Sequence, residues 1–274
     1  MAYAKIMVHV DVDGASEARI RLAATLADRF MSTLIGISAC ILPPYPAEGA
    51  YFVTRELVEE ERKDMAALLK RAEDGFRTLV GADRPKIEWR SEIELPDDYL
   101  AEQARAADLV IIGRDRSPGG ICRAIDPGTA ALKLGRPVLV VPPSIDSLRA
   151  KRVVIGWKDG REARRALQDS LPLLHEAEFV AVVQVCDKGM EAIGKRHVDD
   201  VARYLTRHRI SVGSAVAAHA EGSVADELLR VARAEGADLI VAGAYGHSRL
   251  GEWIFGGVTR DLLASSPVCC LLAN

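Results

Sequence analysis

The sequence predicts an α/β protein built from two tandem, doubly wound, parallel five-stranded sheets. Short apolar runs typical of buried strands alternate with longer segments that carry apolar residues at helical spacing, which is the pattern of parallel sheets covered by helices on both faces. Residues 107–113 and 237–243 also share the pattern Ala-Asp-Leu, aliphatic residues, Gly, at an offset of 130. The same offset aligns Thr129 with Thr259 and Pro137 with Pro267, which indicates a duplication.

The elements of the first half follow from these periodicities. We expect a strand at 6–12, a helix at 16–30, a strand at 33–39 and a proline-containing loop at 43–46. A long helix is expected over 54–80, followed by a strand at 86–91, a short helix at 96–106 and strands at 107–113 and 137–141. We place this domain at residues 1–145, ending after Pro142 and Pro143.

The second half, residues 150–274, repeats the order. Strands are expected at 152–157, 179–185, 210–217, 237–243 and 267–272, with a helix at 224–235 and another that begins near Gly257. Residues 5–11 correspond to 152–158 at an offset of 147, so the first half carries 17 additional residues near 43–80. Their aromatic residues, Tyr45, Tyr51 and Phe52, either cover the core of that half or form a lid or a contact with another chain.

Composition and charge narrow the class of partner. The 274 residues are 49% hydrophobic and 27% charged, which is typical of a soluble globular protein. The net charge is −3, with 36 basic residues scattered among 39 acidic ones, and this argues against nucleic acid and anionic membranes as partners. The apolar runs are too short for a bilayer span and no signal peptide is recognisable, so we expect a cytoplasmic protein.

Neither the cysteines nor the histidines form a chemical motif. The five cysteines lack C-x-x-C spacing, which argues against a disulfide framework and a zinc site. Adjacent Cys269 and Cys270 in a strand should point to opposite faces, either as packing groups or as redox-sensing thiols. The sequence lacks H-x-x-x-H spacing, a nucleophile elbow and a Walker lysine loop, so we expect no catalytic residue and no metal site.

A glycine-rich segment follows the strand at 237–243. Gly243, Gly246, Gly256 and Gly257 would let the chain turn and let an anion approach backbone amides, with the helix near Gly257 directing N–H groups at it. This pattern indicates either a phosphate-binding loop or a tight strand-to-helix turn without a ligand.

The polar residues inside this segment leave three alternatives open. His247, Ser248 and Arg249 are able to donate hydrogen bonds to phosphate oxygens. They could equally be solvated loop residues or helix caps. A catalytic role is the third alternative, although nothing identifies a nucleophile or an oriented base.

Taken together, these features resemble a tandem universal stress protein. The resemblance rests on the two α/β halves, on the spacing Gly-x-x-Gly-x9-Gly in the second half, and on residues 154–166. It implies the strand order 3-2-1-4-5 in each half, with ligand at the carboxyl ends of the strands where the winding reverses. It also implies an intramolecular pseudo-dimer of the two halves through strands 137–141 and 267–272, and allows a further homodimer of chains.

The resemblance implies binding of an adenine nucleotide, ATP or AMP, with or without Mg²⁺. Val185, at the end of the second strand, would give a backbone contact to the base. The residues implied for the site are Gly156, Trp157, Lys158, Asp159, Val185, Gly243, Gly246, His247, Ser248, Arg249, Gly256, Gly257, Val258 and Thr259.

Two departures from the family pattern affect this site. Gly257 replaces the usual Ser or Thr but keeps its backbone N–H. Lys158 replaces the usual acidic residue, so that either Asp159 substitutes for it or Lys158 meets phosphate instead.

The first half departs further from the pattern. Asp11 keeps the acidic position, but the glycine positions hold Arg116, Asp126 and Pro127, so we expect no phosphate there. The leading hypothesis is a stress-response protein whose second half binds nucleotide, without catalysis or with weak ATP hydrolysis. The alternative is an interaction module that retains only the fold.

Overall fold

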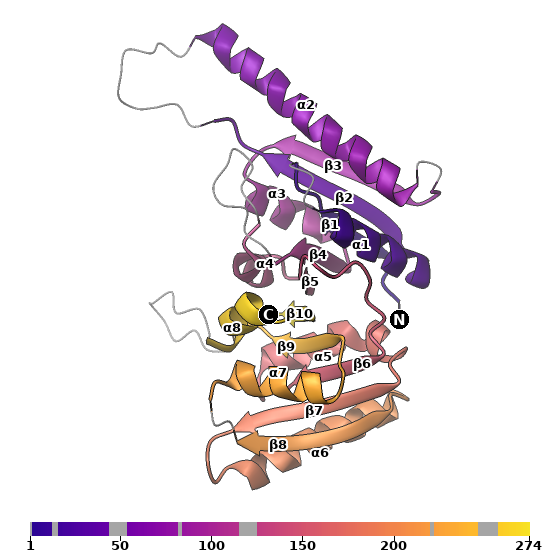
Figure 1. Ribbon diagram of the computed structural model, residues 1–274, viewed down its shortest axis with the longest axis vertical. Helices are drawn as coiled ribbons and strands as arrows, with labels where there is room; N and C mark the ends of the chain where they lie inside the picture. The colour runs from indigo at the N-terminus through magenta and orange to yellow at the C-terminus, as the bar shows by residue number, and fades with distance from the viewer. Residues whose placement is uncertain are drawn as a thin grey trace.

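One continuous sheet of ten strands runs through the molecule (Figure 1). The computed structural model describes residues 2–12, 16–43, 54–81, 84–114, 125–219, 222–245 and 257–274. The strands are β1 (Lys5–His9), β2 (Thr33–Cys40), β3 (Ile87–Ile93), β4 (Leu109–Gly113), β5 (Val138–Val141), β6 (Arg152–Gly156), β7 (Phe179–Cys186), β8 (Val212–His219), β9 (Leu239–Gly243) and β10 (Cys269–Ala273). Their spatial order is β3-β2-β1-β4-β5-β10-β9-β6-β7-β8, so each half has the predicted order 3-2-1-4-5.

Helices cover both faces of this sheet. They are α1 (Glu17–Phe30), α2 (Arg55–Val80), α3 (Pro96–Gln103), α4 (Pro127–Lys133), α5 (Arg161–Leu174), α6 (Glu191–Arg207), α7 (Val224–Ala234) and α8 (Gly257–Ser265), with a 3₁₀ turn η1 (Ala104–Ala106) after α3. The predicted helix at 96–106 is therefore an α-helix that ends in a tighter turn. In the part of the chain that is described, no helix has the length and apolar character needed to cross a membrane.

The halves join where β5 meets β10. These strands pair antiparallel, with Leu139 opposite Leu271 and Val140 opposite Cys270, whereas the other paired strands run parallel. The predicted pairing of the final strands is confirmed. Each half thereby covers the sheet edge that the other would leave exposed, since an unpaired strand presents open N–H and C=O groups.

The cysteines of β10 are buried on the two faces of the sheet. Cys269 packs in the core cluster under α1 and α5, and Cys270 packs in the cluster under α7 and α8, as alternation along a strand predicts. Burial raises the pKa of Cys269 to about 12 and that of Cys270 to about 11. Both thiols are protonated at neutral pH, which favours the packing role over redox sensing. Cys122 lies outside the described residues.

The repeated Ala-Asp-Leu pattern has a structural role. The Asp108 carboxylate accepts hydrogen bonds from the backbone N–H groups of Ala4 at 2.8 Å and Lys5 at 3.0 Å. In the second half, the Asp238 carboxylate accepts from Arg152 N at 3.4 Å. Each aspartate therefore ties the start of the first strand of its half to the start of the fourth, satisfying donors that lie at the end of the ladder.

Helix α2 confirms the helix predicted over 54–80, and its two ends differ. The side chain of Thr54 caps it by accepting from Leu57 N at 3.2 Å. The buried residues, Met65, Leu69, Ala72 and Phe76, all lie in its later part. Its first ten residues bury no side chain, and this end projects past the sheet (Figure 1). Helix α2 has 26 residues and its counterpart α6 has 17, so part of the additional length of the first half lies in this helix. Tyr45, Tyr51 and Phe52 lie outside the described residues.

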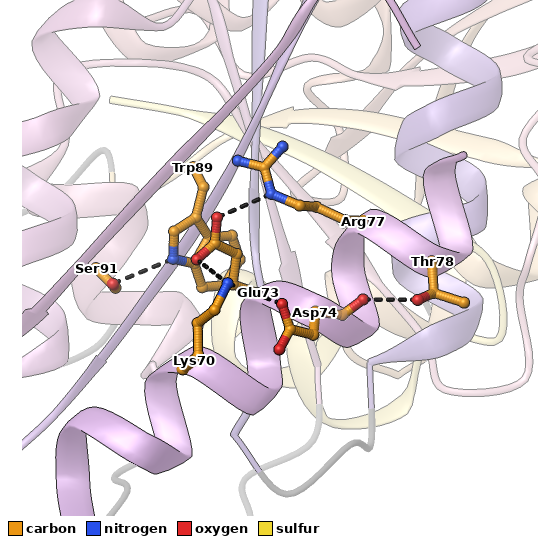
Figure 2. Close-up of polar contacts among 7 residues, drawn as sticks. All are labelled: Lys70, Glu73, Asp74, Arg77, Thr78, Trp89 and Ser91. Carbon is orange, nitrogen blue, oxygen red and sulfur yellow. Dashed lines mark hydrogen bonds and ion pairs between the residues drawn. The ribbon is translucent and has the colours of Figure 1, made fainter. Parts of the chain in front are cut away.

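An aromatic contact anchors the later part of α2 to β3. The rings of Phe76 and Trp89 lie 5.5 Å apart between centroids. Figure 2 shows the hydrogen bond that Trp89 Nε1 donates to Ser91 Oγ at 3.1 Å. Along the helix, Glu73 accepts from Lys70 at 3.3 Å and from Arg77 at 2.8 Å. Such exposed helical pairs contribute only about 0.3–0.5 kcal/mol each, so the buried ring pair is the main anchor.

We predict that Phe76→Ala lowers the free energy of unfolding by about 3–5 kcal/mol, because Phe76 is fully buried against Trp89. The matched control is Leu57→Ala in the projecting part of the same helix, where the side chain is 41% exposed. That change should cost no more than about 0.5 kcal/mol. Urea denaturation followed by circular dichroism measures both. Equal losses of stability from the two substitutions would contradict the conclusion that only the later part of α2 is anchored in the core.

Candidate functional site

The candidate site lies at the carboxyl ends of β6 and β9, where the winding of the second half reverses. Strand β6 pairs with β7 on one side and with β9 on the other, and Gly156 lies opposite Ala242. Chains leaving the two strands therefore turn to opposite faces of the sheet, which is where open α/β sheets commonly bind ligands. We call this position, with the first turns of α5 and α8, the strand-end site.

Gly243 has a packing reason to be glycine. A methyl group built on Gly243 would lie 2.6 Å from the backbone nitrogen of Ala163 and 2.7 Å from the carbonyl carbon of Glu162. The start of α5 thus rests directly on the end of β9, closer than any side chain allows. The glycine is explained without a ligand at this position, in agreement with the tight-turn alternative.

No packing contact with a described residue explains why position 257 is a glycine. A methyl group built there would meet no described atom within 4 Å. Gly257 opens α8, so its N–H belongs to the first turn, whose amides lack partners within the helix. Val258 packs against the core cluster under α7 and α8.

The hydroxyl of Thr259 connects α8 to the end of β9. Thr259 is buried, and its Oγ1 accepts the N–H of Tyr245 at 3.4 Å. This bond uses an acceptor position and leaves the hydroxyl hydrogen able to donate. The first turn of α8 is thereby joined to the chain that leaves β9.

The residues that follow β6 differ in how far their side chains are exposed to solvent. Lys158 and Asp159 are exposed, and Asp159 pairs with Arg164 at 2.6 Å. The ring of Trp157 is instead buried between α5 and α6, beside a pocket of about 470 Å³, and its indole N–H has no hydrogen-bond partner. Its side chain thus serves the α5–α6 face of the sheet. Its backbone N–H donates to Val183 O at 2.7 Å.

Val185 lies where the resemblance requires it, at the open end of β7. Strand β6 ends at Gly156, which pairs with Val183, so Val185 extends two residues beyond its neighbour. Its side chain is half-buried against the cluster under α7. The main chain of Val185 therefore reaches the same edge of the sheet as Lys158.

Glu162 is a residue of this site that sequence reasoning missed. It lies in the first turn of α5, is buried, and accepts from Arg161 Nε at 2.6 Å. One carboxylate oxygen would lie 3.1 Å from a methyl group built on Gly160, at the loop that follows β6. The only signal in the sequence was an acidic residue early in a helix, where the helix dipole favours negative charge. Glu162, rather than exposed Asp159, is the buried carboxylate beside the end of β9.

In the first half, Arg19 fills the corresponding space. A methyl group built on Gly113 would lie 1.9 Å from Arg19 Nη1. The guanidinium donates to His9 O at 2.9 Å and to Asp11 Oδ2 at 2.6 Å, and Arg19 is only 8% exposed. Arg19 is the third residue of α1, and Ala163 is the third residue of α5. At this helix position the first half therefore has a long cationic side chain where the second half has a methyl group.

The charge around Asp11 is balanced internally. Burial alone would raise the pKa of Asp11, but His9 and Arg19 outweigh it and hold the pKa below its ordinary value. The acidic residue that the family pattern assigns to a ligand is thus engaged by the protein itself.

Asp126 takes the place of an anion at the first turn of α4. Its carboxylate accepts from Thr129 N at 2.7 Å and from Thr129 Oγ1 at 2.9 Å. Pro127, at the first helical position, has no N–H to donate. The first half therefore supplies both a cation and an anion of its own where a nucleotide would lie, while Arg116 lies outside the described residues.

Five predicted site residues also lie outside the described part of the chain: Gly246, His247, Ser248, Arg249 and Gly256. Within that part, no group of three or more His, Cys, Asp or Glu residues is arranged to hold a metal ion.

Comparisons with known proteins give a family match for the second half and a fold for the whole chain. Residues 150–273 match the model of the Universal stress protein family. A search of the curated proteins found no match to the sequence.

Among solved structures, a universal stress protein from Archaeoglobus fulgidus DSM 4304 matches with a TM-score of 0.71 and 12% identity, covering 98% of this chain and 96% of that one. The functionally unknown protein PA1789 from Pseudomonas aeruginosa PAO1 matches with a TM-score of 0.58 and 15% identity, covering 99% and 92%. A universal stress protein in complex with cAMP matches with a TM-score of 0.36 and 23% identity, covering 53% and 100%. The full-length matches show that the chain has the two-domain fold of these proteins.

We predict that Arg19→Ala lowers the free energy of unfolding at pH 7 by about 3 kcal/mol, because it removes the buried guanidinium that pairs with the half-buried Asp11 carboxylate. Since the folded-state pKa of Asp11 is lowered, the pair stabilises the fold above the ordinary value of 3.8 and is lost as the pH falls through the folded value. The difference between the variant and the wild type should therefore shrink below about pH 4.

Arg21→Ala is the matched control for this change. Arg21 lies on the same helix and pairs with Glu17 at 3.8 Å, with both side chains more than half exposed. Its loss should cost at most about 1 kcal/mol. Urea denaturation at pH 3 and at pH 7 gives both values, and a constant Arg19→Ala effect between them would contradict the assignment.

Proposed function

Residues 150–273 belong to the universal stress protein family, and on this basis we propose that the second half of the chain binds an adenine nucleotide, ATP or AMP, at the strand-end site. The observation that carries the proposal is the asymmetry between the halves. Arg19 and Asp126 place charged side chains at the strand ends of the first half. In the second half, Ala163 stands where the first half has Arg19, and Gly256, which lies outside the described residues, stands where it has Asp126. Charged groups on one side and small residues on the other are expected if only the second half keeps a ligand.

The phosphates would bind at the start of α8. The N–H of Gly257 and its neighbours are donors at a helix N-terminus, which favours negative charge, and the Thr259 hydroxyl can add a donor. Exposed Lys158, two residues after β6, would supply a cation. Mg²⁺, where present, would arrive with the phosphates.

The nucleoside would lie toward β7. The open backbone of Val185 faces the edge where a base could form hydrogen bonds, and the buried carboxylate of Glu162 can accept from sugar hydroxyls. Glu162 then takes over the role that the family pattern gives to an acidic residue at position 158. The function proposed is ligand binding in a stress response, with occupancy altering shape or partner binding.

An interaction module that binds no nucleotide is the second candidate. It is favoured by Gly243, whose glycine is fully explained by the packing of α5. The two candidates differ in one measurement, an equilibrium titration of the purified chain with labelled ATP and AMP, with and without Mg²⁺. Saturable binding of one nucleotide per chain is expected, and its absence at millimolar nucleotide would overturn the proposal. Nucleoside diphosphate formation in the same samples reports any weak hydrolysis.

We predict opposite effects for two substitutions at Gly257, where a side chain meets no described atom. Gly257→Ser adds a phosphate donor and should tighten ATP binding by about fivefold, the equivalent of one hydrogen bond of about 1 kcal/mol. Gly257→Asp places a carboxylate at the start of α8, which favours the helix but repels phosphate, and should weaken binding at least about tenfold.

The same two changes at Gly75 are the matched controls. Gly75 lies within α2, far along the sheet from β9, and a side chain there also meets no described atom within 4 Å. Neither Gly75 variant should alter the dissociation constant. If the Gly257→Ser and Gly257→Asp variants bound ATP with equal affinity, the phosphates would not lie at the start of α8.

Thr259→Ala and Thr129→Ala form a second matched pair, since the two threonines occupy equivalent positions in the duplication. We expect Thr259→Ala to weaken ATP binding by about tenfold, through the loss of a donor to a charged group. Thr129→Ala should leave the affinity unchanged, because the Thr129 hydroxyl bonds to Asp126. Isothermal titration calorimetry measures both, and an equal loss from the two variants would assign the effect to the fold.

A further inference from the structure

Tyr245 has an unusual backbone conformation at the entrance of the strand-end site. It lies two residues after Gly243, with φ of 57°, in the left-handed region that bulky residues rarely adopt. Its neighbours are held firmly, because Ala244 N donates to Ala273 O at 2.8 Å and Asn274 Nδ2 donates to Ala244 O at 2.8 Å. A strained residue of this kind persists only where its surroundings fix it.

The side chain of Tyr245 reaches into the other half of the molecule. A methyl group built on Gly128, in the first turn of α4, would lie 2.2 Å from the Tyr245 hydroxyl oxygen and 3.4 Å from ring carbon Cζ. The hydroxyl thus lies where a side chain at position 128 would be. This contact is what requires glycine at Gly128, in a helix that belongs to the first half.

Helix α4 is a firm support for this contact. Asp126 caps it through Thr129, and it packs against α8 and β10 across the junction of the halves. In Figure 1, α4 and α8 lie on either side of that junction. The support therefore comes from the part of the first half that corresponds by duplication to the phosphate-binding helix of the second.

We propose that the ligand site is shared between the halves, with Gly128 of α4 as a positioning residue that holds Tyr245 in the left-handed conformation required for nucleotide binding. This inference rests on the proposed function. The Tyr245 N–H bonds to Thr259, so the conformation of Tyr245 also fixes the threonine hydroxyl and the direction in which the chain leaves β9. In this way the first half contributes a residue to the ligand site of the second half, although its own strand-end position is occupied by Arg19.

The geometry offers a test by compensating substitutions. Gly128→Ala places a methyl group on the Tyr245 hydroxyl and should weaken ATP binding at least tenfold. Tyr245→Phe removes that oxygen and its contact with Gly128, and should weaken ATP binding by about threefold, less than Gly128→Ala does. In the double variant the methyl group would meet Cζ at 3.4 Å and Asp126 Oδ1 at 3.2 Å, contacts that shifts of a few tenths of an ångström accommodate. The affinity should therefore return to that of Tyr245→Phe alone. Gly75→Ala, at a glycine with no described neighbour, is the control.

Urea denaturation of the same four proteins gives a readout that needs no ligand. The loss of stability in Gly128→Ala should also be relieved by Tyr245→Phe, since the cycle isolates the pairwise contact. If Gly128→Ala fails to fold, recovery of folding and ATP binding in the double variant carries the same conclusion.

The outcomes separate the inference from the proposed function. If the wild-type protein binds no nucleotide, the proposed function and the shared site are both overturned. The contact between Tyr245 and Gly128, which the denaturation experiment measures, would then have a structural role alone. Wild-type protein that binds ATP, with Gly128→Ala binding equally well, overturns the shared site alone. Additive effects of the two substitutions on ATP affinity would likewise overturn it.

Discussion

The antiparallel pairing of β5 with β10 is the constraint on which the rest of the structure depends. It converts two five-stranded halves into one sheet of ten strands and removes the edge that each half would otherwise expose. Because the final strand of each half is preceded by the helix that would face phosphate, the same pairing brings α4 and α8 together. The contact between Tyr245 and Gly128 exists only because of this arrangement.

The duplicated halves use one architecture in two ways. Asp108 and Asp238 perform the same structural task in both, tying the fourth strand to the first. The ends of the strands then diverge, because Arg19 occupies the first half with a cation that Asp11 balances, whereas α5 packs its backbone onto Gly243. One half has internal charges where a ligand would supply them, and the other keeps donors at the start of α8.

Periodicity and repetition in the sequence were sufficient for the fold because both are local signals. The strands and helices fall within a few residues of their predicted bounds, and the offset of 130 revealed which strands correspond. The site was predicted less completely. The sequence leaves Gly243 as either a phosphate contact or part of a tight turn, and its packing against Ala163 suffices to explain it. Glu162 was missed because a single early-helix acid is a common cap.

The sequence by itself determined the fold class, the duplication, the loss of the phosphate pattern in the first half and the pairing of the final strands. Only the tertiary structure decided which side chains occupy the strand ends, that Arg19 lies against Gly113 and pairs with Asp11, and that Tyr245 rests on Gly128 of the other half. The physical reason is the range of the interactions. Strand and helix patterns repeat along the chain, whereas the contact of Tyr245 with Gly128 joins residues more than a hundred positions apart that only folding brings within touching distance.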